Sequence, residues 1–313
     1  MINLERDYEP QAVNSFSGAL AIDEVYDKEF CIFFATDPLN KRPVSFHLCR
    51  SGDGQELETF LRHLKSIGVK PEVLIVDGST LYASVPQKVW PGVSIQLCVF
   101  HVIRNCQDHI QDAIKAFYRL LPKGKRWPHE DFIAPEWWTN AIQRGNRDRH
   151  LIRNNRYAFT TRTENLKPEQ REILEGLCQH HPALCTIRRF HSDLLSLFER
   201  NQTKEQARQK LRTMAENPDY QEMPYLVLAL KRLSTAKFEK MVTFLDYENL
   251  DATTNHVERT NRWFRKRQKT HYRNRKERTI RNMLKTDLQR WVKEPLVPVM
   301  LIERMPSVWR GVA

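Results

Sequence analysis

Three acidic residues stand where a carboxylate could hold a metal ion. Asp23 lies inside the β-rich run GALAIDEVY, and Asp77 directly follows the short apolar run VLIV. Glu258 follows Asn255 by three residues, which is the capping-box spacing at the start of a helix. An acid among apolar strand residues needs a partner, because burying an unpaired carboxylate is costly. The question is whether the three acids meet in the fold.

If the strand that carries Asp23 and the strand that ends at Asp77 are parallel neighbours, the two carboxylates lie side by side at the carboxyl edge of the sheet. Such acids repel each other unless they share a proton or a divalent cation. Glu258, on a helix packed against the sheet, would complete an all-oxygen site for two Mg²⁺ or Mn²⁺ ions. Paired sites of this kind perform phosphoryl transfer on nucleic acids.

Each acid also has a simpler interpretation. Asp23 could face solvent at a sheet edge, Asp77 could cap a helix that begins near Ser79, and Glu258 could cap a solvated basic helix. Cysteines and histidines also cluster in CQHHPALC (178–185), but Pro182 interrupts the spacing and the neighbours are helical and apolar. We interpret that cluster as core and helix end rather than as a zinc site.

The segment from Asn255 to Arg281 holds most of the excess positive charge. From Arg259 to Arg281 there are eleven Lys and Arg residues, within a chain of net charge +12 and a pI near 9.5. Such a surface attracts polyanions, and nucleic acid is the first candidate. We expect DNA contacts from Arg259, Arg262, Arg265, Lys266, Arg267, Lys269, Arg273, Arg275 and Lys276.

Five strands are expected in the first third of the chain, because short apolar runs alternate there with polar turns. They are predicted at residues 18–26, 30–36, 43–48, 73–76 and 93–100. The first three would form an antiparallel meander and the last two would be linked by crossovers, since helical spacing predicts helices at 55–67 and 103–121. The predicted fold class is therefore α/β, with a mixed five-stranded sheet flanked by helices.

The middle of the chain shows helical periodicity punctuated by prolines and little strand pattern. An all-helical insertion therefore interrupts the sheet domain, with a looser stretch at about 127–163. The predicted organisation is an N-terminal extension (1–17), the first part of the core (18–121), the helical insertion (122–250), the last part of the core with the Glu258 helix (251–290) and an extended C-terminal tail (291–313).

The composition is that of a soluble globular protein, with 41% hydrophobic and 28% charged residues. No run is as long and apolar as a membrane span, and the N-terminus lacks a signal-peptide pattern. The six cysteines form no Cys-x-x-Cys pair, which indicates reduced thiols. We expect a cytoplasmic, DNA-associated protein that has no membrane partner.

Taken in order, these motifs resemble the DDE transposases of bacterial insertion sequences. The matching stretches are ALAIDEVYD around Asp23, VLIVDGS around Asp77, LCVFHVIRN, and NHVERTNRWFRKRQK around Glu258, and together they cover about residues 18–285. Within that group the chain looks like the branch related to Mutator-type elements, which has a similar Cys-x-x-His motif. The resemblance implies a ribonuclease-H-like core with a helical insertion before the Glu.

The resemblance also assigns roles to individual residues. It implies that Asp23 bridges two Mg²⁺ (or Mn²⁺) ions, that Asp77 and Glu258 each hold one, and that Arg262 and Arg265 grip backbone phosphates. The other residues that it places near the site are Cys98, His101, Asn255 and Asn261. The implied partners are double-stranded DNA, at element ends and target, and further copies of the chain in a homo-oligomer.

The function predicted from these observations is a DNA transposase that cuts at element ends and transfers the freed strand into target DNA. Two other functions remain open: a catalytically silent or domesticated DNA-binding protein, and a ribonuclease-H-like nuclease. A metal-dependent nicking assay distinguishes the transposase from a silent DNA-binding protein, which would not cut. Joining of DNA ends distinguishes it from a nuclease, which would not join them. Family members usually carry an N-terminal zinc-binding and helix-turn-helix region, whereas about 17 residues precede the first strand here, so recognition of the ends is not assigned.

Overall fold

The computed structural model describes residues 8–27, 29–123, 136–253, 260–262, 264–266, 276–292 and 297–304. Contacts between Cα atoms divide the chain into two compact units. The first unit comprises Met1–His101 and Thr235–Ala313, and the second comprises Val102–Ser234. The domain boundaries expected after residues 121 and 250 remain predictions.

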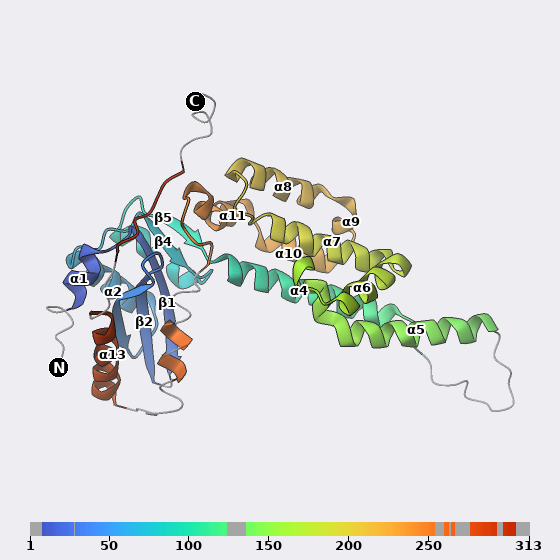
Figure 1. The fold of residues 1–313 in the computed structure, drawn as a ribbon, viewed down its shortest axis with the longest axis horizontal. Helices are drawn as coiled ribbons and strands as arrows, with labels where there is room; N and C mark the ends of the chain where they lie inside the picture. The colour runs from blue at the N-terminus through green and yellow to red at the C-terminus, as the bar shows by residue number, and fades with distance from the viewer. Residues whose placement is uncertain are drawn as a thin grey trace, which may run out of the picture. The chain divides into compact units, whose positions relative to one another are not determined.

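A mixed five-stranded sheet forms the centre of the first unit (Figure 1). Its strands are β1 (Ala19–Asp27), β2 (Phe30–Asp37), β3 (Arg42–Cys49), β4 (Val73–Val76) and β5 (Ser94–Leu97). The spatial order is β3-β2-β1-β4-β5, with β1, β2 and β3 antiparallel and with β4 parallel to both β1 and β5. The predicted meander followed by parallel strands is confirmed, and β1 is the central strand.

Helix α2 (Gly54–Ser66) covers one face of this sheet. Its apolar side chains are buried, and Phe60 stacks on Phe33 of β2 with their ring centroids 6.3 Å apart. The helix begins after Asp53, whose carboxylate accepts hydrogen bonds from two backbone amides of the first turn. The helix predicted at 55–67 is therefore present, and its amphipathic face fixes which side of the sheet it occupies.

The opposite face is covered by residues from the C-terminal part of the chain. Phe34, the neighbour of Phe33 on β2, packs against Phe264 with ring centroids 6.0 Å apart. Since consecutive strand residues point to opposite faces, Phe264 and α2 lie on different sides of the sheet. Helix α13 (Glu277–Val292) contacts β3 and buries Ile280 and Leu284.

Short elements complete the first unit. They are α1 (Glu9–Asn14), the 3₁₀ turn η2 (Thr80–Tyr82), α3 (Val85–Val89), α11 (Thr235–Met241) and the 3₁₀ turn η5 (Thr243–Asp246). The last two pack on β5: the Gln96 side-chain amide donates to the carbonyl of Met241, and the Gln96 Oε1 accepts from the amide of Phe244. A buried glutamine on an edge strand thus satisfies the polar backbone of its covering turn.

The prediction of a strand over 93–100 is wrong in its last three residues. β5 ends at Leu97, and α4 (Val99–Leu120) begins earlier than the expected residue 103. The backbone amide of Val99 donates to the carbonyl of Ala252, so it is held by a neighbouring segment and not by a strand ladder. A short apolar run has no periodicity that separates a buried strand from the first turn of a buried helix.

The C-terminal residues 297–304 run in extended form along the first unit, as expected for the tail. The amide of Val299 donates to Asn40 Oδ1, and the amide of Leu301 donates to the carbonyl of Ser17. Glu303 forms a β-bridge with Tyr247. The bonds of Val299 and Leu301 join this segment to the turn between β2 and β3 and to the residues before β1.

The second unit is helical throughout the part that the structure describes. It holds most of α4 and then α5 (Glu136–Asn155), η3 (Arg156–Thr160), η4 (Thr163–Asn165), α6 (Pro168–His180), α7 (Pro182–Ser196), α8 (Lys204–Glu216), α9 (Pro218–Gln221) and α10 (Pro224–Arg232). The looser stretch expected at 127–163 is wrong for α5, which is a regular helix. Of the described helices, none is long and apolar enough to cross a bilayer.

Candidate active site

Asp23 and Asp77 lie at the same level of two neighbouring parallel strands. β1 pairs with β4 through Ala21 and Ile75, and each acid comes two residues after its member of that pair. Asp77 directly follows Val76, the last residue of β4. Because a two-residue step keeps a side chain on the same face of a strand, this register brings the two carboxylates together at the carboxyl edge of the sheet.

The fold holds Asp23 in an environment that disfavours its charge. Burial, then the nearby Glu24 carboxylate and, more weakly, Asp77 raise the pKa of Asp23 from 3.8 to about 7. His101 acts in the opposite direction. Two carboxylates therefore disfavour the charge of Asp23, and His101 offsets only part of their effect. The edge of the sheet is a place where negative charge is concentrated.

Asn261 reaches Asp23 from the other end of the chain. Residues 260–262 and 264–266 are helical, and Phe264 packs on Phe34, which is the strand partner of Asp23. The Nδ2 of Asn261, a residue that is 3% exposed, donates a hydrogen bond to Asp23 Oδ2. Asn261 Oδ1 is buried and accepts no hydrogen bond from the described residues.

Glu24 and Tyr82 adjoin this site from the other face of β1, and neither was predicted from the sequence. The Tyr82 hydroxyl donates to Glu24 Oε2, and burial, partly offset by this bond, raises the pKa of Glu24. The nearby Asp77 carboxylate also raises it. Burial raises the pKa of Tyr82 as well, so its proton stays available for the bond. The Asp-Glu pair within an apolar strand could have indicated Glu24. No local pattern could have indicated Tyr82, which lies 58 residues further along the chain.

Cys98 and His101 lie at the junction between β5 and α4. The amide of Cys98 donates to the carbonyl of Val76 over 2.8 Å, which ties this junction to the residue before Asp77. The Cys98 side chain is fully buried, whereas His101 lies in the first turn of α4 and interacts electrostatically with Asp23. The structure therefore brings His101 to the carboxylates and fixes Cys98 as part of the junction.

Several predicted site residues lie outside the described residues. These are Glu258, Asn255, Arg259, Arg267, Lys269, Arg273 and Arg275. The other predicted DNA contacts are Arg262, Arg265, Lys266 and Lys276, and all four are exposed. Arg262, Arg265 and Lys266 belong to the same helical stretch as Asn261, so positive charge stands close in sequence to the residue that contacts Asp23.

The donor atoms of this site suit a hard divalent cation. The carboxylates of Asp23 and Asp77 and the buried Asn261 Oδ1 are all oxygens, which Mg²⁺ and Mn²⁺ prefer. Repulsion between Asp23 and Asp77 would be relieved by such a cation. Asn261 Oδ1, which accepts no hydrogen bond from the described residues, is a further oxygen that such a cation could bind.

Residues 20–276 match a transposase family, DDE_Tnp_ISL3. The chain belongs to the ISL3 family of DDE transposases. The match spans the sheet, the second unit and the basic helical stretch, so it covers the whole set of predicted motifs. No curated protein matches the chain.

Membership of this family makes the protein an enzyme that acts on DNA in transposition and DNA recombination, as insertion-sequence transposases do. The prediction of an insertion-sequence transposase is thereby confirmed. A protein of this class binds DNA, which agrees with the net charge of +12.

Proposed function

We propose that this transposase cleaves DNA at the ends of its element and transfers the freed 3′ end into target DNA. The observation that carries the proposal is the meeting of Asp23, Asp77 and Asn261 at the carboxyl edge of the sheet. A half-buried carboxylate with its pKa raised to about 7 and a second acid beside it is a costly arrangement. Such arrangements are typical of catalytic sites rather than of structural cores.

Asp23, Asp77 and Glu258 would hold divalent cations, with Mg²⁺ or Mn²⁺ as the expected metal and two ions as the expected number. When bound, these ions would supply Lewis-acid chemistry to the scissile phosphate and the attacking oxygen. Support for Glu258 as the third acid comes from the sequence, since it precedes Asn261 by three residues. Asn255, on the other side of Glu258, is proposed to adjoin the same site.

The remaining residues position these acids and the DNA. Asn261 fixes the rotamer of Asp23 through its hydrogen bond. Cys98 holds the β5–α4 junction beside Asp77, and His101 offsets part of the negative charge at Asp23. The predicted basic residues, with Arg262 and Arg265 the nearest in sequence to Asn261, would bind backbone phosphates and so set the register of DNA at the site.

Two finer assignments belong to the same proposal. The strand order, with a central β1 flanked by an antiparallel pair and two parallel strands, supports a ribonuclease-H-like core. The position of Cys98 and His101 after β5 supports the resemblance to the Mutator-related branch. By analogy with enzymes that must hold two DNA ends together, the active form is proposed to be a homo-oligomer.

The test is cleavage and strand transfer by the full chain and by its Asp23→Asn variant. The substrate is plasmid DNA carrying the sequences that flank the protein's own gene, with Mg²⁺ or Mn²⁺ added. Asp23→Asn removes a metal ligand while keeping an acceptor for Asn261, so we expect cleavage to fall by roughly 10²–10³-fold or more. DNA affinity should stay nearly unchanged in a gel-shift assay.

Glu58→Gln is the matched control, because Glu58 is a carboxylate on α2, on the opposite face of the sheet. It should cleave as the unmodified protein does. Strand transfer that survives Asp23→Asn would overturn the assignment of the acids. DNA binding by the unmodified chain without cleavage under either metal would indicate a silent DNA-binding protein, and cleavage without joining would indicate a nuclease.

A further inference from the structure

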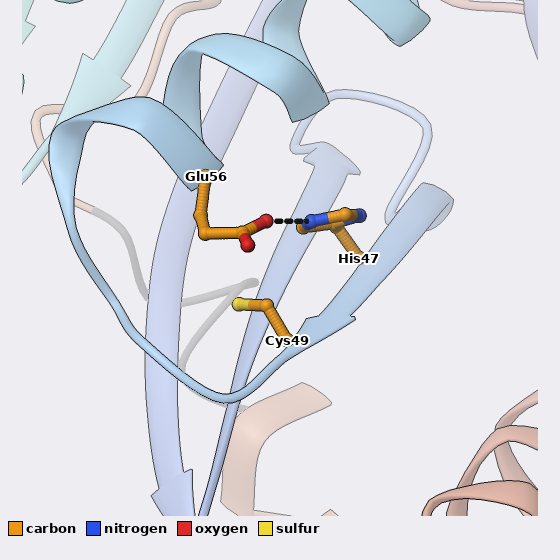
Figure 2. Close-up of side chains that lie close together, drawn as sticks. All are labelled: His47, Cys49 and Glu56. Carbon is orange, nitrogen blue, oxygen red and sulfur yellow. Dashed lines mark hydrogen bonds and ion pairs between the residues drawn. The ribbon is translucent and has the colours of Figure 1, made fainter.

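A second group of metal-ligating side chains lies on the face of the sheet opposite to Asp23. His47 and Cys49 are on β3 and Glu56 is in the first turn of α2 (Figure 2). One ligand atom from each residue lies within 4.8 Å of the other two. His, Cys and Glu together form a donor set that neither an apolar core nor a solvated surface requires.

The geometry of β3 and α2 produces this group. His47 and Cys49 are two residues apart on a strand, so both side chains point to the face that α2 covers. Glu56 reaches them from the first turn of α2, which begins after the N-cap residue Asp53. Figure 2 shows the three side chains converging from the strand and the helix on the space between them.

The distances between the donor atoms are close to those of a zinc site. His47 Nε2 lies 2.7 Å from Glu56 Oε2, and the Cys49 thiol is near the backbone carbonyl of Ser51 at 3.1 Å. Two ligands of a tetrahedral zinc ion at about 2.1 Å lie about 3.4 Å apart, so the histidine and carboxylate need to separate by well under 1 Å. Their side chains are 26% and 37% exposed, which gives an ion access from solvent.

The donor types select the metal. A thiolate, an imidazole and a carboxylate suit zinc or another borderline transition metal, whereas Mg²⁺ prefers oxygen ligands alone. Three protein ligands leave the fourth tetrahedral position to a water molecule, which the exposed side of His47 and Glu56 can admit. This chemistry differs from that of Asp23 and Asp77, whose donors are oxygens.

The two groups also occupy opposite faces of the sheet. Asp23 pairs with Phe34, and His47 pairs with Phe33. Phe34 packs on Phe264, whereas Phe33 packs on Phe60 of α2. Because neighbouring strand residues face opposite sides, the cluster of His47, Cys49 and Glu56 is a separate site from the catalytic acids.

We infer that His47, Cys49 and Glu56 bind one zinc ion, which joins the edge strand β3 to the start of α2. The ion would replace a single hydrogen bond between strand and helix with three metal–ligand bonds. The ion would hold the last residues of the edge strand to the helix that covers the core. The site does not depend on the proposed transposition chemistry.

The experiment uses the full chain stripped of metal with a chelator and titrated with Co²⁺, which binds zinc sites and reports a thiolate ligand by charge-transfer absorption. We expect one equivalent to give this absorption, Zn²⁺ to displace the cobalt, and Mg²⁺ in excess to leave it. Cys49→Ser should abolish the absorption. His47→Gln and Glu56→Gln should weaken cobalt binding by at least about tenfold, since even changes outside the ligand shell cost that much.

Two matched variants keep the test decisive. Cys185→Ser removes an exposed thiol in the second unit and Asp23→Asn alters the catalytic acids, so both should keep the cobalt absorption. Circular dichroism shows whether each variant is folded. Absence of the absorption in the unmodified chain would overturn the inference. So would an absorption that persists in Cys49→Ser, or one that disappears in Cys185→Ser, because it would place the thiolate elsewhere.

Discussion

Asp23 is an acid whose folded environment favours its protonated form. Its pKa of about 7 lies well above the ordinary 3.8, and the causes are burial, Glu24 and Asp77. Between these two pH values the folded chain binds a proton that the unfolded chain has lost. Stability of the metal-free protein must therefore fall as pH rises from about 4 through 7.

This linkage predicts that Asp23→Asn stabilises the metal-free protein at pH 8 and has little effect near pH 4. Each pKa unit corresponds to about 1.4 kcal/mol, so the gain at pH 8 should be up to a few kcal/mol. Urea unfolding in the presence of a chelator measures it. Glu24, whose pKa is also raised, keeps part of the pH dependence in the variant. Equal pH profiles for the two proteins would contradict the assigned environment of Asp23.

The sequence was sufficient to single out Asp23 and Asp77 but not Glu24 and Tyr82 beside them. Both acids follow from strand context, since one interrupts an apolar strand and the other ends one. Glu24 alternates with Asp23 and so points to the other face of β1. Its burial depends on Tyr82, which packs there only because η2 follows β4. A contact between distant segments of this kind has no local signal.

At the scale of elements, strand order followed from the sequence while one boundary did not. Alternation and crossover length predicted the meander and the parallel strands, both of which the sheet has. The start of α4 at Val99 could not be predicted, because Cys98 and Val99 continue the apolar run of β5. The amide of Val99 instead donates to the carbonyl of Ala252, a residue far away in the chain, and so does not continue the strand.

The turn that joins β2 to β3 depends on one buried carboxylate, Asp37. It accepts hydrogen bonds from the amide and hydroxyl of Ser17, from the amides of Leu39 and Asn40, and from the Asn40 side chain. Asn40 in turn bonds Val299 of the tail. One acid therefore links the turn, the residues before β1 and the C-terminal segment.

Asp37→Ala should accordingly destabilise the protein more than loss of a surface acid. Several buried donors would lose their acceptor, and each unsatisfied donor costs about 1–3 kcal/mol, so we expect a loss of roughly 3 kcal/mol or more. Chemical denaturation of the unmodified chain, Asp37→Ala and Asp112→Asn measures it, since Asp112 is partly exposed on α4 and pairs only with Lys115 among the described residues. A loss below about 1 kcal/mol, the value of a single ordinary hydrogen bond, would argue against this account.

At the scale of the whole molecule, acids and bases are arranged in a way that the order of motifs made predictable. Each motif alone is weak, but the sequence of two strand acids, a junction histidine and a basic segment spans residues 20–276, as the family match does. The helical stretch with Asn261 also carries the exposed Arg262, Arg265 and Lys266, as the basic helix expected there implies. These positively charged side chains thus stand close in sequence to the residue that contacts Asp23. DNA phosphates can neutralise their positive charge.

Replacing Arg262, Arg265 and Lys266 together by Gln should therefore weaken DNA binding without regard to sequence and make it less sensitive to salt. Each lost phosphate contact reduces the slope of log K against log salt by about 0.9, so three contacts would flatten it by up to about 2.7. Fluorescence anisotropy over a range of salt concentrations measures this slope. Lys70→Gln is the control, because Lys70 is exposed before β4 begins, at the opposite end of that strand from Asp77. An unchanged slope in the triple variant would show that these residues do not contact the DNA backbone, and the path of DNA would then have to be sought on other basic surfaces of the chain.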